Sequence, residues 1–182
     1  VVEDDQVHLV SICTPNDTHA EIAIAALAAG KHVWCEKPMS TTLADSTAMA
    51  NAAASSAGKT IVGYNYTKNP AVTHARRLID SGVIGRVSGF FCRYDVDNEA
   101  DGNRPWSWRM SRDKSGTGAN GDVLSHVISV GHYLTGSVIS KVVGDIAIIH
   151  PQRADEANPA TQKTVDNDDM VSALVNFENG VK

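Results

Sequence analysis

The sequence contains no apolar run of about eighteen residues, the length a helix needs to span a bilayer, so no segment is expected to cross a membrane. It also lacks an excess of basic residues, because 16 lysines and arginines stand against 21 aspartates and glutamates and leave a net charge of −5. Nucleic acids and anionic lipid surfaces both require a basic protein surface. We therefore exclude them as partners.

Cysteine is scarce as well, and the three that occur, Cys13, Cys35 and Cys92, are far apart and form no C-x-x-C pair. Each lies in an apolar, strand-like segment. We interpret them as reduced core residues of an intracellular, cytoplasmic protein. The 182 residues, 42% of them apolar and 20% charged, suffice for one ordinary globular domain or for parts of two.

Neither end of the sequence has the features of a natural terminus. The chain opens with Val1 and not with Met, and a strand-like segment reaches the hairpin-type pair Asn179-Gly180 with only two residues beyond it. We expect an internal portion of a longer protein, in which a targeting signal would lie outside this sequence.

Residues 1–69 alternate between short apolar segments and alanine-rich segments. This pattern predicts strands at 7–13, 31–38 and 60–66 and helices at 18–29 and 40–58. Thr18 and Glu21 have the spacing of a capping box, and Gly30 is suited to end the first helix. The βαβαβ order predicts the second half of a Rossmann-type doubly wound parallel sheet, with its first strand buried on both faces and its ligand at the carboxyl edge.

From residue 70 onward the pattern changes to longer strands joined by polar loops. We expect helices at 69–82 and 122–136 and strands at 86–97, 139–151 and 170–177, with polar segments at 98–116 and 152–169. The acidic run at 166–169 is interpreted as a solvated turn. The second part is therefore predicted to be an α+β domain, incomplete at its end, with an open, mainly antiparallel sheet.

Two functional patterns overlap in "GTGANGDVLSHVISVGH", residues 116–132. Gly116, Gly118 and Gly121 spell the dinucleotide fingerprint G-x-G-x-x-G, but the polar "WSWRMSRDKS" stands where the fingerprint needs a strand, so we interpret the glycines as a loop. Asp122 and His126 lie four residues apart, which places both on one helix face as a candidate acid–base pair. The alternative is that Asp122 complements the helix dipole and that His126 is only a satisfied partner. No metal is predicted, because His132 lies off that face.

Three segments together resemble the Gfo/Idh/MocA oxidoreductases. They are "VSICTPNDTHAEIAIAALAAGKHVWCEKPMS", with its T-P, A-G-K-H and E-K-P elements, "VGYNYTKNPAVTHARRLIDSGVIGRV", and "WSWRMSRDKSGTGANGDVLSHVISVGHYLTG", with its D-x-x-x-H helix. The resemblance covers nearly the whole chain in the family's order. Leu124 and Ser129 depart from it, since the family often has glycine and a second aspartate there.

The resemblance implies a Rossmann domain that binds NAD or NADP, of which residues 1–69 would be the C-terminal part. Residues 70–182 would then belong to a substrate-binding and oligomerisation domain of a homodimer or homotetramer. Carried over by motif, Lys37, Asp122 and His126 would be catalytic. The cofactor would be bound by Lys37 together with Thr14, Pro15, His19, Glu36 and Pro38, and the family often has a cis peptide before this proline.

The implied activity is an NAD(P)-dependent dehydrogenase or reductase that moves a hydride between a nicotinamide and a hydroxyl or carbonyl of a sugar, polyol or cyclitol. His126 would take the hydroxyl proton, Asp122 would orient and tune the ring, and Lys37 would bind the alcohol oxygen. Alternatively, Lys37 is a solvated lysine at a strand end.

The candidates for substrate binding are Asn65, Trp108 and Arg109. Asn65 and its neighbour Tyr64 could equally be turn and packing residues, and an arginine in a polar loop is often solvated. Two other functions share the fold: an NAD-dependent glycosidase and a non-catalytic regulator that senses the dinucleotide.

Overall fold

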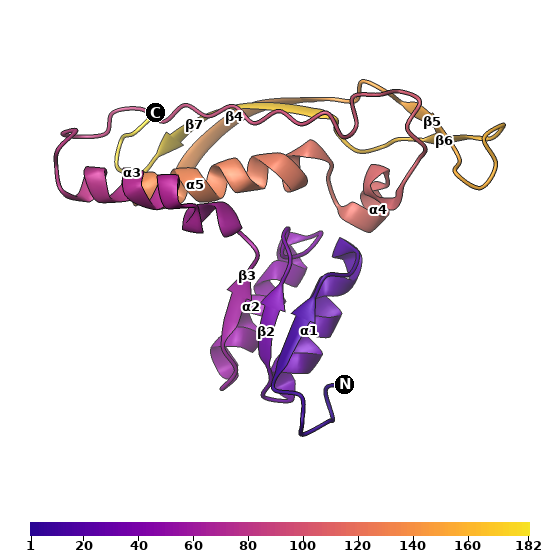
Figure 1. The fold of residues 1–182 in the computed structure, drawn as a ribbon, viewed down its shortest axis with the longest axis horizontal. Coiled ribbons are helices and arrows are strands. Elements are labelled where there is room, and N and C mark those ends of the chain that lie inside the picture. The colour runs from indigo at the N-terminus through magenta and orange to yellow at the C-terminus, as the bar shows by residue number, and fades with distance from the viewer.

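The computed structural model describes residues 1–182 as two lobes arranged like a T (Figure 1). The lower lobe holds the parallel sheet β1-β2-β3, and the upper lobe holds the antiparallel pair β4–β7 with α3 and α5 beneath it. The helices are α1 (His19–Ala28), α2 (Leu43–Ser55), α3 (Pro70–Asp80), α4 (Arg112–Ser115) and α5 (Ser125–Thr135). The strands are β1 (Leu9–Ile12), β2 (His32–Cys35), β3 (Thr60–Val62), β4 (Ile139–Ala147), β5 (Gln152–Ala154), β6 (Gln162–Thr164) and β7 (Met170–Phe177).

The lower lobe has the βαβαβ topology that the sequence predicts, with both strand pairs parallel. Its core is formed by alternate strand residues and by the inner faces of the two helices, namely Ile12, Ala23, Ala26, Leu27, Val33, Cys35 and Met49. Both helices cover the same face of the sheet. Leu9, Trp34 and Ile61 on the other face are therefore exposed, and the prediction that the first strand is buried on both faces is wrong.

The start of α1 also differs from the prediction. A 3₁₀ turn over Asn16–Thr18 precedes the helix and gives Thr18 a helical backbone. Its hydroxyl lies within hydrogen-bond distance of the Thr14 Oγ1 and of the Pro15 carbonyl, and it caps no amide, so the predicted capping box does not form. The helix end is as expected, since Gly30 adopts a left-handed φ of 72°.

In the upper lobe, α5 packs against the sheet through Gly131, where a Cβ would lie 3.2 Å from Phe90 and 3.3 Å from Phe177. Segment 86–97 is extended, but its predicted strand does not form. Only Ser88 and Phe90 share backbone hydrogen bonds with Lys182, which are too few for a ladder. Conversely, the polar segment 152–169 contains the hairpin β5–β6, which the sequence did not predict.

The cysteines differ in burial, contrary to the prediction that all three are core residues. Only Cys35 is buried, and burial raises the pKa of its thiol to about 11. Cys13 is exposed because β1 ends one residue before it at the edge of the sheet, and Cys92 is exposed in the extended segment.

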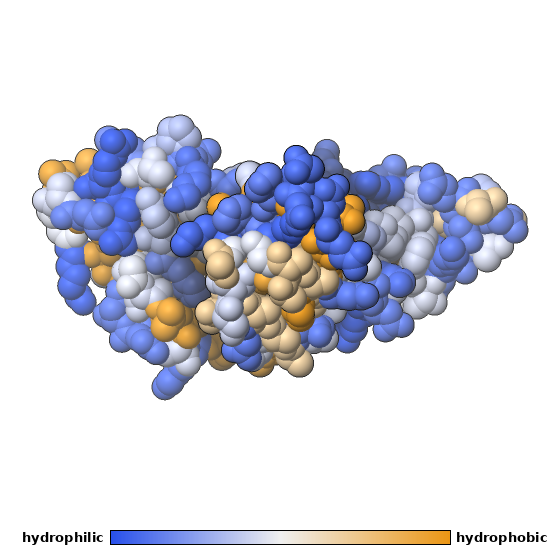
Figure 2. All heavy atoms as spheres, turned by 90° about the horizontal axis from the view of Figure 1, so that it is seen from below, coloured by the Kyte–Doolittle hydropathy of each residue, from blue (hydrophilic) through white to orange (hydrophobic).

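The longest helix, α2, has 13 residues, and none of the helices has the length and hydropathy of a membrane span. Seen from below, the middle of the molecule carries most of its weakly hydrophobic surface, and the two ends are mainly hydrophilic (Figure 2). This middle region is the lobe of the alanine-rich α1 and α2.

The cap of α2 generates a stability prediction. The Thr42 Oγ1 accepts the Asp45 amide at 3.1 Å at the first turn of the helix. Thr42→Ala should lower the free energy of unfolding of the full-length protein by about 1 kcal/mol, because the amide loses its partner. Thr42→Ser should restore most of it. Urea denaturation checks this, and an unchanged midpoint for Thr42→Ala would contradict it.

Candidate active site

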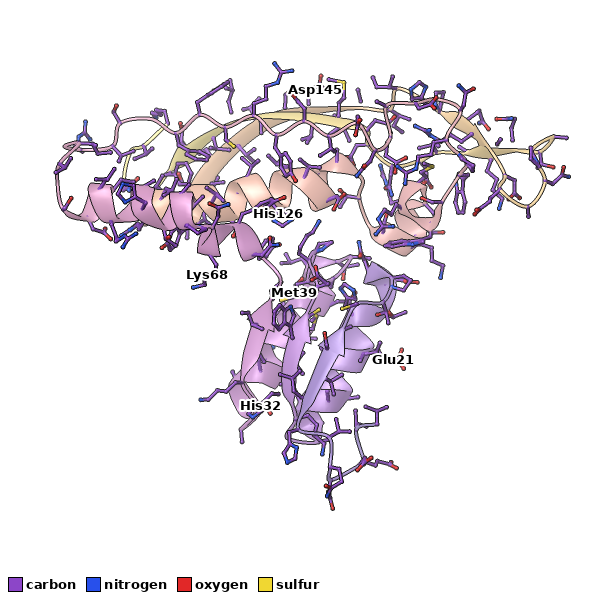
Figure 3. All side chains as sticks on the ribbon, viewed as in Figure 1. Glu21, His32, Met39, Lys68, His126 and Asp145 are labelled. Carbon is purple, nitrogen blue, oxygen red and sulfur yellow. The ribbon has the colours of Figure 1, made fainter.

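The carboxyl ends of the three parallel strands all point toward the upper lobe, at the place where α5 crosses above them (Figure 1). The turn after β2 carries Glu36, Lys37 and Pro38, and the Lys37–Pro38 peptide is cis, as the resemblance implies. In Figure 3, His126 lies on the underside of α5 and Met39, next to this turn, lies below it in the lower lobe. The candidate site is therefore built from both lobes.

Lys37 and Asp122 form a bridge between the lobes at the site. The Lys37 ammonium makes an ion pair with the Asp122 carboxylate and also donates to the Asp122 backbone carbonyl at 3.0 Å. The lysine side chain is only 16% exposed, whereas that of Asp122 is 54% exposed. The Lys37 ammonium is thus held by Asp122 and largely shielded from solvent, so the alternative of a solvated lysine is wrong.

His126 lies on the first turn of α5 and is buried. Its Nδ1 is shielded from solvent and has no hydrogen-bond partner. Burial lowers the pKa of the ring below its ordinary value, and the Lys37 charge lowers it further, while the charges of Asp122 and Glu36 act in the opposite direction. The histidine is therefore favoured in its neutral form, which can accept a proton.

Asp122 does not bind the His126 ring, although the two were predicted to share a helix face. A π-helical turn over Asn120–Leu124 precedes α5 and carries Asp122. The carboxylate contacts Lys37 instead, and it affects His126 only through its charge. The structure thus brings the three predicted catalytic residues together in an arrangement different from the predicted one.

Aromatic rings surround His126 on the side of the β3–α3 connection. The Tyr66 ring lies 4.5 Å from the imidazole centroid at a tilt of 47°, and the Tyr64 ring stands edge-on at 6.0 Å. Burial raises the pKa of Tyr64. The Tyr66 hydroxyl shares a 2.6 Å hydrogen bond with that of Tyr94, from the extended segment. These rings shield the imidazole from water, which is the main cause of its lowered pKa.

His19, predicted to bind cofactor, is 1% exposed and supports the loops from beneath. Its Nδ1 lies 3.0 Å from the Pro38 carbonyl and its Nε2 lies 2.9 Å from the Thr14 carbonyl. Since both nitrogens are engaged with backbone, His19 links the loop after β1 to the turn after β2 and has no free atom for a ligand.

The other predicted cofactor residues lie at the same sheet edge. Thr14 and Pro15 are exposed on the loop after β1. The Glu36 carboxylate accepts the Lys37 amide at 3.2 Å and lies beside Gly63, where a Cβ would be 3.0 Å from it. This edge is therefore open at β1 and occupied by a carboxylate between β2 and β3.

The predicted substrate residues are more dispersed. Asn65 is exposed at the start of the 3₁₀ turn that follows β3, between Tyr64 and Tyr66 in the sequence. Trp108 and Arg109 form a separate pair, in which the guanidinium lies 4.5 Å from the indole centroid. Neither makes a hydrogen bond or a ring contact with Lys37, Asp122 or His126.

The glycine-rich loop is not a nucleotide fingerprint, because the short helix α4 and not a strand precedes it. Its amides are already engaged, since Gly118 and Asn120 donate to the carboxylate of Asp168 at 3.0 and 2.6 Å. The prediction that the acidic run 166–169 is a solvated turn is therefore wrong. Asn167 and Asp168 are 2% and 6% exposed, because Asp168 faces this loop and Asn167 faces Arg109 and Ser115 before it.

Sequence reasoning missed four residues near the site: Tyr66, Tyr94, Asn167 and Asp168. Tyr66 had a recognisable signal, a second tyrosine two residues after Tyr64 at the end of a strand. Asn167 and Asp168 had no such signal, because nothing in the acidic run shows which distant groups it binds.

The arrangement combines a neutral histidine, a directed lysine ammonium and the open edge of a parallel sheet. A buried imidazole that lacks a partner can accept a proton from a hydroxyl group. The adjacent ammonium can stabilise negative charge that develops on the same oxygen. The carboxyl edge of a doubly wound sheet is where nucleotides bind in such folds.

Comparison with known families agrees with this geometry. The model described as "Oxidoreductase family, NAD-binding Rossmann fold" matches residues 1–64, and the model of the GFO/IDH/MocA C-terminal domain matches residues 72–182.

Individual relatives cover the whole chain. Levoglucosan dehydrogenase of Pseudarthrobacter phenanthrenivorans is 39% identical over 99% of this chain and 49% of its own length. A crystal structure of an oxidoreductase domain protein from Kribbella flavida is 42% identical, with a TM-score of 0.93 over 99% of this chain and 48% of its own. A levoglucosan dehydrogenase structure in complex with NADH and levoglucosan is 41% identical, with a TM-score of 0.93 over 100% of this chain and 47% of its own.

This chain spans about half the length of these relatives. Both of its lobes match the corresponding family models, in the order that the resemblance implied. The chain belongs to the Gfo/Idh/MocA family of oxidoreductases.

Proposed function

We propose that the protein containing this chain is an NAD(P)-dependent dehydrogenase or reductase of a sugar or a sugar-like polyol. The observation that carries the proposal is the juxtaposition of the buried, unpartnered His126 with the directed ammonium of Lys37. A regulator that only senses a dinucleotide has no need of a proton acceptor beside a fixed cation.

In the direction of alcohol oxidation, the neutral His126 accepts the hydroxyl proton. Lys37 donates a hydrogen bond to the same oxygen and stabilises its developing negative charge. Asp122 holds the ammonium in place through its carboxylate and its backbone carbonyl. Asp122 thus acts on the oxygen through Lys37, and it also tunes His126 through its charge.

A bound nicotinamide would supply the acceptor for the hydride that leaves the same carbon. The residues of this chain fit such a group, because the loop after β1 with Thr14 and Pro15 is exposed next to Lys37 and Pro38, whereas His19 fastens these two segments from below. We expect these loops to line the cofactor, with His19 in a supporting role. The glycine-rich loop would not contribute, since Asp168 already binds its amides.

For the substrate, the relatives named levoglucosan dehydrogenase make an anhydrosugar or another pyranose the first candidate. Tyr66 fits this class, since a tilted aromatic ring beside the imidazole offers a surface to the apolar face of a sugar. Asn65 stays a candidate because it follows the same strand. Trp108 and Arg109 stay candidates for more remote contacts.

We further propose that residues 1–69 are the end of the nucleotide domain and residues 70–182 the start of the substrate domain. Asn69 caps α3 and Pro70 opens it, which makes this helix start a natural boundary. The apolar side chains exposed on β4 and β7, such as Val142, Val143 and Leu174, support assembly of the whole protein through this sheet, as a homodimer or homotetramer.

The experiment that tests the activity follows the absorbance of reduced nicotinamide. The full-length protein is given NAD or NADP with levoglucosan, inositols, aldoses and sugar acids. We expect reduction with at least one sugar or polyol and its loss in His126→Ala. If sugar is released from a glycoside without net reduction, the glycosidase alternative is favoured. If cofactor binds and no compound reacts, the proposal fails in favour of the regulator.

The role of Lys37 predicts a separation of activity from stability. Lys37→Met should reduce turnover by about 100-fold or more, because the developing oxyanion loses its cation. It should lower the free energy of unfolding by at most about 1 kcal/mol, since its partner is half-exposed. Lys68→Met, on the exposed neighbouring turn, is the control. Turnover equal to that of the control would rule out this role.

The lowered pKa of His126 predicts the pH dependence. Oxidation requires the neutral ring, so kcat/KM should fall only as the pH drops below about 6.5, the ordinary histidine value. Asp122→Asn removes a negative charge that favours the imidazolium, so the pKa should fall further and the acid limb should move to lower pH. Asp145→Asn, on the distant β4 sheet (Figure 3), should leave the limb in place. A shift to higher pH in Asp122→Asn would contradict the prediction.

A further inference from the structure

Asp168 is a buried carboxylate that the proposed mechanism does not use. It lies between β6 and β7, is 6% exposed, and forms no ion pair. An unpaired carboxylate at this depth is costly unless hydrogen bonds compensate its charge. The hydrogen-bond partners of Asp168 therefore indicate its role in the structure.

Those partners are three consecutive backbone amides of the glycine-rich loop. Gly118 donates to Oδ1 at 3.0 Å and Asn120 donates to Oδ2 at 2.6 Å, while Ala119 donates to the backbone carbonyl of Asp168 at 2.8 Å. Successive amides that converge in this way form an anion-binding nest. Gly118 is required for the approach, since a Cβ there would lie 2.0 Å from the Asp168 carbonyl.

The nest is connected directly to the Lys37–Asp122 ion pair. The Gly118 carbonyl accepts the backbone amide of Asp122 at 2.9 Å. Asp122 in turn holds the Lys37 ammonium by its carboxylate and its carbonyl. A chain of hydrogen bonds thus runs from Asp168 through Gly118 and Asp122 to Lys37.

The other end of this chain of contacts is anchored in the sheet of the upper lobe. The Asp169 amide donates to the Ala147 carbonyl at 2.8 Å, next to the point where β4 and β7 begin to pair. Asn167, on the other side of Asp168, donates its side-chain amide to the Arg109 carbonyl at 2.7 Å. Asp168 is therefore held at a fixed position, and the loop takes its position from it.

We propose that Asp168 is a positioning residue, which sets the turn before α5 so that Asp122 and His126 face Lys37. The inference rests on the proposed function for its effect on rate, but its effect on the geometry of the site is independent of turnover. Substitution by asparagine keeps the size of the side chain. It replaces one acceptor by an NH₂ group that opposes an amide N–H, so one of the two side-chain bonds is lost.

The same acidic run offers a matched control. The Asp169 carboxylate also accepts two backbone amides, those of Ile149 and His150 at 2.6 and 3.1 Å. These amides belong to the end of the sheet and not to the glycine-rich loop. Asp169→Asn therefore removes a carboxylate charge from the neighbouring position, while the oxygen that remains can keep both amides, since both bind Oδ2. An effect of the lost charge alone should appear in both variants, whereas a positioning role, which depends on the lost hydrogen bond, should appear only in Asp168→Asn.

The test compares the two variants in the full-length protein by NMR titration of ¹³C-labelled histidine, with His126→Gln used to assign the signal. His126 is faced by Lys37 and Glu36 from the turn after β2, by Asp122 from the preceding turn, and by the rings of Tyr64 and Tyr66. Since burial is the main cause of its lowered pKa, a displaced turn admits water and should move the titration up, toward the ordinary value. We expect this in Asp168→Asn and no change in Asp169→Asn.

The kinetic arm uses the substrate found with the wild-type protein. Asp168→Asn should lower kcat by about 10- to 100-fold with a smaller change in KM, as expected for misplaced catalytic groups, and Asp169→Asn should not. If Asp168→Asn fails to fold, Asp168→Glu, which shifts the carboxylate by one methylene, should show the same direction of change. A His126 titration that is unchanged in Asp168→Asn, or changed equally in Asp169→Asn, overturns the proposal. A wild-type protein that turns over no substrate overturns the proposed function alone, because the titration still decides the positioning role.

Discussion

The candidate site depends on one ion pair that joins the two lobes. Lys37 and Asp122 are 85 residues apart in sequence and meet only because the sheet edge of one lobe lies under the long helix of the other. A pair of partly exposed charges contributes at most about 1 kcal/mol, so it cannot determine how the lobes pack. Its effect is local: it places a cation beside a desolvated imidazole. The reactivity of the site consequently follows from the packing of the lobes.

Much of the lower lobe could be predicted from the sequence because its signals are local. Alternation, alanine content and Gly30 each act within a few residues, and together they specify βαβαβ. The predictions that failed concern features that the residue pattern alone does not decide. Segment 86–97 has the residues of a strand, but a strand also needs a partner along its length. The capping box at Thr18 failed because the preceding 3₁₀ turn altered the backbone on which the cap depends.

The candidate site was predictable in its members but not in its contacts. The motifs led to Lys37, Asp122 and His126, yet the spacing of Asp122 and His126 suggested that they bind one another. The π-helical turn that carries Asp122, which spacing does not reveal, directs its carboxylate to Lys37. Asp168 gave no local signal at all, since its partners lie about fifty positions earlier. Acidic runs resemble solvated turns until the amides that they bind are known.

The loop around α4 has a mechanical consequence for the molecule. The Asn16 side chain donates to the Ser115 carbonyl at 3.0 Å, and Lys114 pairs with Asp17 at 2.8 Å, so this loop is tied to the start of α1. The covalent connection after β3 lies on the opposite side of the site (Figure 1). Besides the Lys37–Asp122 pair inside the site, the lobes are thus joined along two opposite sides, by these polar contacts on one side and by the peptide connection on the other. An opening of the lobes about the peptide connection would therefore break the polar contacts at α4 together with the Lys37–Asp122 pair.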